Sequence, residues 1–213
     1  MALNLSMINQ IQKGIISEYN PIHSNSPKMI WKTKRRFGKT TTLLKILLNQ
    51  IEKTSSDLNV WMISNNQSNT KILYQKLNIL LLDRYSTNRK VKYRYNRKTR
   101  IDLVKEVSEI ENNEGSLTRL SITISHPEKK LTLPNTKIDP PDLILIDEIR
   151  LMGSYRFNQI LEILESTKTK INSDYSNLSF FATTTNNLTK TDIDSLQVSI
   201  PSLEILTTDL KTI

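Results

Sequence analysis

The chain has 213 residues, of which 37% are hydrophobic and 24% charged, a balance that favours a soluble globular protein with one sizeable core. No apolar run approaches the roughly 20 residues needed to span a bilayer, and the N-terminus lacks the pattern of a secretory signal, so we expect no membrane association. The absence of cysteine excludes disulfides, thiol catalysis and thiolate metal sites, and fits a reducing intracellular compartment. The net charge of +9 favours polyanionic partners such as nucleic acid, although a coding bias toward Lys, Asn and Ile would also produce it.

The first half of the chain predicts helices alternating with buried strands. Residues 1–28 predict an N-terminal helix and a linker, because apolar residues recur at helical spacing before a polar stretch with prolines. The apolar run 29–31 predicts a strand, and residues 39–53 predict a helix with one apolar face. A second strand is predicted at 59–64. A further helix is predicted at 68–85, with Ser68 or Asn69 as its N-cap.

The second half continues the alternation less regularly. Residues 91–95 predict a strand with one basic face, and residues 101–110 predict a helix. Further predicted elements are strands at 120–125, 131–133, 143–146 and 178–182 and a helix at 155–166. Strands that are apolar throughout and alternate with helices predict an α/β fold with a mostly parallel sheet and helices on both faces.

Segment 32–40, KTKRRFGKT, places a Gly-Lys-Thr triplet between an apolar strand and an apolar-faced helix. A phosphate-binding loop needs this triplet at such a turn, because Gly38 lets the backbone approach the phosphates, Lys39 neutralises them and the Thr40 hydroxyl binds Mg²⁺. The usual pattern also has a glycine where this chain has Thr33, so a chance triplet in a Lys- and Thr-rich chain is the alternative. Further candidate nucleotide contacts are Arg36, Phe37 and Thr41.

Two later segments supply the remaining groups of a nucleotide hydrolase in the expected order. Segment 143–148, LILIDE, predicts a buried strand that delivers Asp147 as a Mg²⁺ ligand and Glu148 as a general base. Segment 180–186, FFATTTN, predicts another buried strand whose polar end contacts the γ-phosphate or the attacking water. Alone, the first segment could be a core strand that ends in a solvated acidic turn, and the second could be an ordinary strand followed by a turn. Their order after the Gly-Lys-Thr triplet favours the nucleotide-hydrolase interpretation. The candidate coupling residues are Thr183, Thr184, Thr185 and Asn186.

Together these segments resemble the ATPase domain of the large subunit of viral DNA-packaging terminases, of the herpesvirus and tailed-phage type and most nearly the herpesvirus type. Terminase phosphate loops commonly lack the first glycine and carry arginine, as residues 35–40, RRFGKT, do. Residues 143–148 resemble the second ATPase motif of the family, and residues 183–186 resemble its coupling motif. The resemblance covers roughly residues 29–187, including a strand at 120–126 between these motifs.

The resemblance implies a P-loop NTPase fold of the RecA/ASCE type that binds ATP and Mg²⁺ and hydrolyses ATP to move double-stranded DNA into a preformed capsid. The implied partners are duplex DNA, the portal and capsid, and other terminase subunits in a homo-oligomeric ring. The implied location is the viral assembly site in the host nucleus or cytoplasm. The family also implies a loop arginine at the γ-phosphate, best matched by Arg35, and an upstream glutamine at the adenine, for which Gln10 and Gln12 are candidates.

Terminase large subunits also carry a C-terminal nuclease domain with clustered carboxylates. Here only a short tail, residues 188–213, follows the core at 29–187, and its acidic residues are scattered. We therefore expect a single P-loop ATPase domain over residues 1–213 and no nuclease activity. Two alternatives remain open: a superfamily-2 helicase-like ATPase fragment, and a non-catalytic DNA-binding assembly subunit.

The stretch 84–100 contains many Lys and Arg residues and no acidic residue. A motor that acts on any sequence should hold DNA phosphates rather than read bases, and a basic strand and loop suits this task. The alternative is a solvated strand whose charge only aids solubility. The candidate DNA contacts are Lys92, Arg94, Arg97 and Lys98.

Overall fold

The described residues form one sheet with helices packed on it. The computed structural model describes residues 5–19, 28–53, 57–85, 91–95, 100–107, 116–125, 141–149, 158, 178–185, 188–200 and 202–208. Within these residues the helices are α1 (Leu5–Glu18), α2 (Lys39–Lys53), α3 (Gln67–Tyr85) and α5 (Lys190–Ser199). The strands are β1 (Lys28–Thr33), β2 (Leu58–Ile63), β3 (Val91–Tyr95), β4 (Arg100–Val107), β5 (Ser116–Ser125), β6 (Leu143–Ile146), β7 (Ser179–Thr184) and β8 (Glu204–Thr208).

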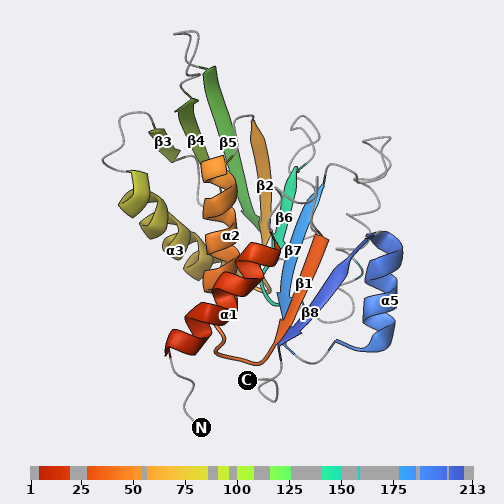
Figure 1. Ribbon diagram of the computed structural model, residues 1–213. Coiled ribbons are helices and arrows are strands. Elements are labelled where there is room, and N and C mark those ends of the chain that lie inside the picture. The colour runs from red at the N-terminus through yellow and green to blue at the C-terminus, as the bar shows by residue number, and fades with distance from the viewer. Residues whose placement is uncertain are drawn as a thin grey trace.

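The strand order is β3-β4-β5-β2-β6-β7-β1-β8, which can be followed from left to right in Figure 1. Neighbouring strands from β5 to β8 are parallel, whereas β3, β4 and β5 pair antiparallel. The strand that precedes the Gly-Lys-Thr triplet, β1, is thus separated by β7 alone from β6, the strand that ends at Asp147. Because parallel strands end at the same edge, the three predicted motifs meet there.

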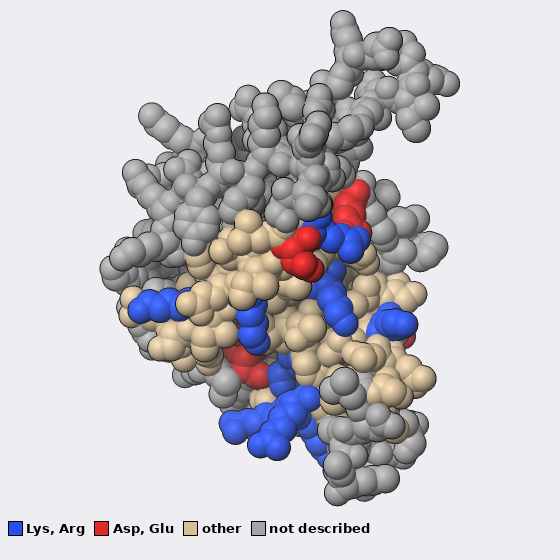
Figure 2. Space-filling view, turned by 90° about the vertical axis from the view of Figure 1, so that its left-hand side faces the viewer, with Lys and Arg blue, Asp and Glu red and all other residues tan. Residues whose placement is uncertain are grey.

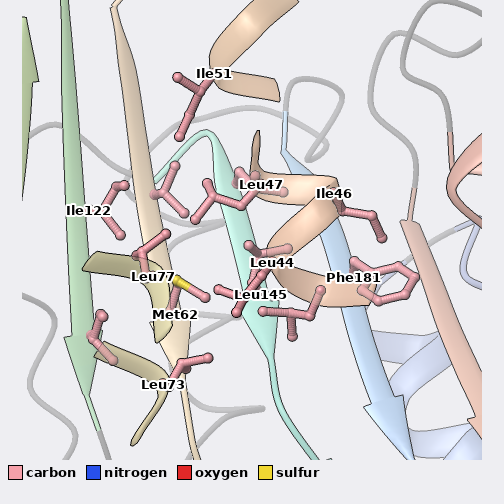
Figure 3. Close-up of a cluster of buried hydrophobic side chains, with 14 of the residues drawn as sticks. Leu44, Ile46, Leu47, Ile51, Met62, Leu73, Leu77, Ile122, Leu145 and Phe181 are labelled. Atoms are coloured by element: carbon pink, nitrogen blue, oxygen red, sulfur yellow. The ribbon is translucent and has the colours of Figure 1, made fainter. Parts of the chain in front are cut away.

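One face of the sheet is covered by α1, α2 and α3, which lie in front of the strands in Figure 1. The apolar side of α2 contributes Leu44 and Leu47, which pack with Met62 of β2, Leu145 of β6 and Phe181 of β7 (Figure 3). These side chains are almost fully removed from water. Burial of this apolar surface fixes α2, and therefore the loop before it, against the parallel strands.

The opposite face is covered by α5. Its Leu196 packs in a second buried cluster with Ile30 of β1, Ile144 of β6 and Phe180 of β7. Adjacent residues of one strand thus enter opposite clusters, as the pleat requires. The predicted parallel α/β fold with helices on both faces is confirmed.

Two sequence predictions are wrong in this part of the chain. The sequence predicts a helix at residues 101–110, but β4 pairs with β3 on one side and β5 on the other. Apolar residues in this segment fit both periods, and the two strand partners decide the outcome in favour of β structure. In addition, α3 begins at Gln67, and the Asn66 side chain accepts a hydrogen bond from the Asn69 amide at 2.9 Å, so Asn66 is its N-cap.

The last described elements add to the sheet. After the capping box at Thr189, α5 leads back to β8, which pairs parallel with β1 from Met29 to Thr33. The Trp31 indole donates a hydrogen bond to the Thr208 hydroxyl at 3.0 Å. The predicted strand at 131–133 and helix at 155–166 lie outside the described residues, except for Asn158. Among the helices described, none combines the length and apolar character of a membrane span.

Candidate active site

The loop between β1 and α2, which the sequence predicts to bind phosphate and which we call the phosphate loop, turns sharply before α2. Gly38 has φ 74° and Arg36 has φ 70°, so the chain passes twice through the left-handed region before α2 begins at Lys39. A non-glycine residue in this region costs about 1 kcal/mol or more, and such strain clusters at functional sites. Thr33, which occupies the position of the missing glycine, belongs to β1 and needs no left-handed backbone. Its presence therefore does not prevent the turn.

Lys39 points into the site. Its side chain is 9% exposed, and Nζ lies 3.2 Å from Oε2 of Glu148 and donates to the carbonyl of Lys34 at 3.1 Å. The ammonium group is therefore held between the loop backbone and the acidic end of β6. A phosphate that enters the loop meets a positioned cation.

Asp147, directly after β6, joins the first and third motifs. Its Oδ2 accepts a hydrogen bond from the Thr40 hydroxyl at 2.9 Å, and its Oδ1 accepts one from the Thr183 hydroxyl at 3.3 Å. Burial raises the pKa of the Asp147 carboxyl, and the hydrogen bonds from Thr40 and Thr183 oppose that rise. A nearby metal cation would favour the ionised form in the same way.

Glu148 is held by its backbone and its side chain. Its φ is 63°, and its amide donates to the Thr183 hydroxyl at 3.0 Å. Its Oε1 accepts a hydrogen bond from the Thr185 amide at 2.6 Å, while Oε2 faces Lys39. The carboxylate of Glu148 therefore links the phosphate loop to the end of β7. Sequence reasoning predicted a base at this position but gave no signal for the ion pair with Lys39.

The three threonines at the end of β7 have different contacts. Thr183 contacts both acidic residues, the Thr185 amide contacts Glu148, and the Thr184 hydroxyl donates to the Thr185 carbonyl at 3.1 Å. All three are buried. Asn186 lies outside the described residues. The predicted coupling segment thus lies beside the two carboxylates.

The other predicted nucleotide contacts fall into two groups. Arg35, Arg36 and Thr41 are exposed. Phe37 is buried, and its ring packs in the main core cluster. Figure 2 shows Lys and Arg side chains gathered near the lower end of one face, the end at which this loop lies in Figure 1. The exposed arginines are thus available to an anion at the loop.

The two candidate adenine contacts also differ. Gln10 is exposed on α1. Gln12 is 4% exposed, and its amide donates to the Phe37 carbonyl at 3.3 Å and accepts from Nζ of Lys45 at 3.0 Å. The side chain of Gln12 is therefore directed at the phosphate loop itself.

Of the candidate DNA contacts, Lys92 and Arg94 lie on β3, whereas Arg97 and Lys98 lie outside the described residues. In the antiparallel register, Lys92 stands opposite Val104 and Arg94 stands opposite Asp102. The assignment of Lys92 and Arg94 to contacts with DNA stays a prediction.

The residues at this edge suit Mg²⁺ bound together with a nucleotide. Mg²⁺ prefers oxygen ligands and is usually held by one or two carboxylates and substrate phosphates. The Thr40 hydroxyl and the Asp147 carboxylate are such oxygens, and they already lie 2.9 Å apart. Within the part of the chain that is described, no group of three or more His, Cys, Asp or Glu residues could hold a metal without such a ligand.

No family model and no curated protein sequence matches this chain. Solved structures share its fold. The large terminase ATPase domain of Thermus phage P74-26 matches with a TM-score of 0.62 at 10% identity, over 86% of this chain and 76% of that chain. The large terminase of a thermophilic bacteriophage, solved in complex with ATP-gamma-S, matches with a TM-score of 0.56 at 12% identity, over 94% of this chain and 44% of that chain.

A third similar structure is S. cerevisiae dbp5 bound to gle1 and ip6, with a TM-score of 0.54 at 11% identity, over 99% of this chain and 53% of that chain. At these identities the comparisons establish the fold alone. The chain spans less than half the length of the terminase solved with ATP-gamma-S. The predicted fold is therefore confirmed, and it is shared with phage large terminase ATPase domains and with dbp5.

Proposed function

We propose that this chain is the ATP-hydrolysing motor subunit of a viral terminase and translocates double-stranded DNA into a capsid. The observation that carries the proposal is the set of hydrogen bonds and the ion pair that join Lys39, Thr40, Asp147, Glu148 and Thr183 at one edge of the sheet. These groups come from three segments far apart in sequence. Their side-chain chemistry is that required for phosphoryl transfer to water.

Lys39 binds the β- and γ-phosphates in this proposal. Its ammonium group contacts Glu148 and the Lys34 carbonyl in the structure, and a triphosphate would take the place of Glu148. Thr40 and Asp147 would hold Mg²⁺, which neutralises charge on the phosphate oxygens when it is bound. The loop amides and the N-terminus of α2 add backbone donors for the same anion.

Glu148 acts as the general base. Once Lys39 turns to the phosphates, one carboxylate oxygen of Glu148 is free to accept a proton from the water that attacks the γ-phosphorus, and ADP leaves with the bond to that phosphorus broken. The other oxygen keeps the hydrogen bond from the Thr185 amide. A shift of β7 on loss of the γ-phosphate would therefore move the Glu148 carboxylate. This is the coupling role that we propose for residues 183–186.

Arg35 contacts the γ-phosphate in its own or a neighbouring subunit, and Arg36 either shares this role or pairs with a carboxylate. The support is their exposure beside the loop and their charge. Duplex DNA, portal and capsid, and a homo-oligomeric ring of subunits complete the proposal. The basic strand β3 is the proposed contact with the DNA backbone.

A single-turnover ATPase assay with and without double-stranded DNA tests the proposal. We expect hydrolysis that duplex DNA stimulates and that leaves the strands paired. Strand separation would assign the chain to the helicase-like ATPases instead. The absence of hydrolysis in every assembly state, with DNA binding retained, would identify a non-catalytic assembly subunit.

A further inference from the structure

Helix α1 lies across the phosphate loop, and Gln12 is its point of contact. The Gln12 Nε2 donates to the Phe37 carbonyl, and its Oε1 accepts from Lys45 of α2. We propose that Gln12 is a positioning residue that fixes the backbone of the phosphate loop, so that it supports binding of the triphosphate and does not read the base. The inference rests on the proposed nucleotide site.

The surroundings of Gly38 support this role. A Cβ atom built on Gly38 would overlap the amide nitrogen of Gln12 and would also approach the side chain of Ile8. The glutamine amide therefore lies directly against the backbone at the left-handed turn that precedes Lys39. The φ of 74° favours glycine at this position, and a side chain there would displace the Gln12 amide from the loop.

The position of Gln12 is itself fixed. Ile15, one turn further along α1, and Tyr19, directly after α1, are buried in the main core. The Tyr19 ring packs edge-to-face on Phe181 of β7, with ring centroids 5.0 Å apart. Phe37 belongs to the same core cluster. The amide of Gln12 thus joins a helix anchored on the sheet to the loop backbone, and its 4% exposure leaves little surface for a base.

Without this contact the loop would still close, because α2 and β1 hold its ends. It would, however, lose the hydrogen bond at Phe37, which orients the peptide unit immediately before Gly38. The carbonyl of Phe37 points toward α1, so the amide of the same peptide unit points away from α1. Since backbone N–H groups bind the phosphates, a change in this peptide plane lowers affinity for any triphosphate, whatever its base.

The test compares ATP, GTP and inorganic tripolyphosphate as ligands, each with Mg²⁺, by calorimetric titration. Gln12→Met keeps the volume of the side chain and removes both hydrogen bonds. We expect Gln12→Met to lower the affinity for all three ligands by the same factor, about tenfold. Asn9→Met, an exposed amide replaced in the same helix, should leave all three affinities as in the wild type.

Lys45→Met provides a second variant on the surface of α2, should Gln12→Met fail to fold. It removes the hydrogen bond to Oε1 alone, and we expect a smaller loss of about threefold, again equal for the three ligands. Lys13→Met removes the same charge from the exposed side of α1 and controls for long-range attraction.

Three outcomes overturn the inference. If Gln12→Met weakens ATP and leaves tripolyphosphate unchanged, Gln12 reads the base. If it changes none of the ligands, the contact with Phe37 has no role in binding. If Lys45→Met and Lys13→Met have equal effects, the hydrogen bond to Gln12 contributes nothing. A wild-type protein that binds none of the three ligands would instead contradict the proposed function.

Discussion

The parallel and antiparallel parts of the sheet use their residues in different ways. In β6 every position is buried, and the polar groups stand only after the strand has ended. In β3 basic residues alternate with apolar and aromatic ones, so the charges lie along the strand itself. The parallel part thus concentrates polar groups at one edge, which suits chemistry on a small ligand. The sequence of β3 places basic residues at alternate positions, a pattern that suits contact with a long polyanion.

The two regions are also far apart. Six steps separate β3 from β1 in the strand order, and at about 4.8 Å per step this amounts to roughly 30 Å. No side chain reaches across that distance. Changes at the phosphate loop should therefore affect hydrolysis and leave DNA binding intact, and changes on β3 should do the reverse.

The largest effect is expected from Glu148→Gln. The amide keeps the size of the side chain and removes the base, so turnover should fall by at least about 100-fold, while Mg·ATP binding and duplex binding persist. Single-turnover hydrolysis and nucleotide titration measure the two quantities. Glu204→Gln, an exposed acid on β8, should hydrolyse ATP as the wild type does. Unchanged turnover in Glu148→Gln would remove Glu148 from the mechanism.

The ion pair between Lys39 and Glu148 predicts a further effect, on stability without nucleotide. Both side chains are nearly buried, at 9% and 12% exposed, so Lys39→Met leaves a buried carboxylate without its cation and should cost about 3 kcal/mol of unfolding free energy. The double variant Lys39→Met/Glu148→Gln should recover part of this loss. Urea denaturation of the four proteins measures the coupling, and additive losses would show that the pair is not formed in solution.

Arg35→Ala should have a moderate effect, mainly on the rate of ATP hydrolysis. Hydrogen bonds to charged groups contribute about 1.5–3 kcal/mol, so turnover should fall about 10- to 100-fold, with a smaller loss of ATP affinity. The matched variant Lys34→Ala removes an exposed charge from the same loop and should change turnover less. Equal losses of turnover and affinity in Arg35→Ala would mean that the arginine attracts the nucleotide without stabilising the reaction.

The sequence predicted β1, β6 and β7 well because each contains an apolar run and is followed by a distinctive motif. It did not predict β8, whose residues are short of apolar character. The Gly-Lys-Thr triplet and the Asp-Glu pair could be assigned to one edge because each follows a predicted strand of a parallel sheet. The segment 101–110 could not be assigned, because residues such as Ile101, Val104 and Val107 satisfy helical spacing and β propensity alike. Only the pairing with β3 and β5 decides between them.

Contacts between segments that are distant in sequence could not be predicted either. Helical spacing places Gln12 on the apolar face of α1, four residues after Ile8 and three before Ile15, and leaves Gln10 off that face. Only the packing of α1 shows that Gln12 contacts the phosphate loop. The same holds for Lys39, whose partner Glu148 lies more than 100 residues further along the chain. Motifs therefore predict which groups are present, and tertiary packing decides what they contact.

The smallest effect is expected from the basic residues of β3 and of positions 97 and 98. Replacing Lys92, Arg94, Arg97 and Lys98 with Gln should flatten the dependence of duplex affinity on salt by about one unit of slope per lost phosphate contact. Hydrolysis in the absence of DNA should be unchanged. The measurement is duplex binding across a salt series for the wild type and the variant.

A control must separate local contacts from the loss of net charge. The quadruple variant removes four positive charges, and so does the replacement by Gln of four exposed lysines elsewhere: Lys13, Lys71, Lys76 and Lys190. If β3 contacts the DNA backbone, only the first variant flattens the salt dependence, because the number of released counterions depends on phosphate contacts and not on total charge.

The strand register adds a finer test. Asp102 stands opposite Arg94, so Asp102→Asn should strengthen duplex binding. Coincident slopes for the two quadruple variants would mean that the basic face of β3 acts only through net charge, and the contrast between the two parts of the sheet would then concern folding alone.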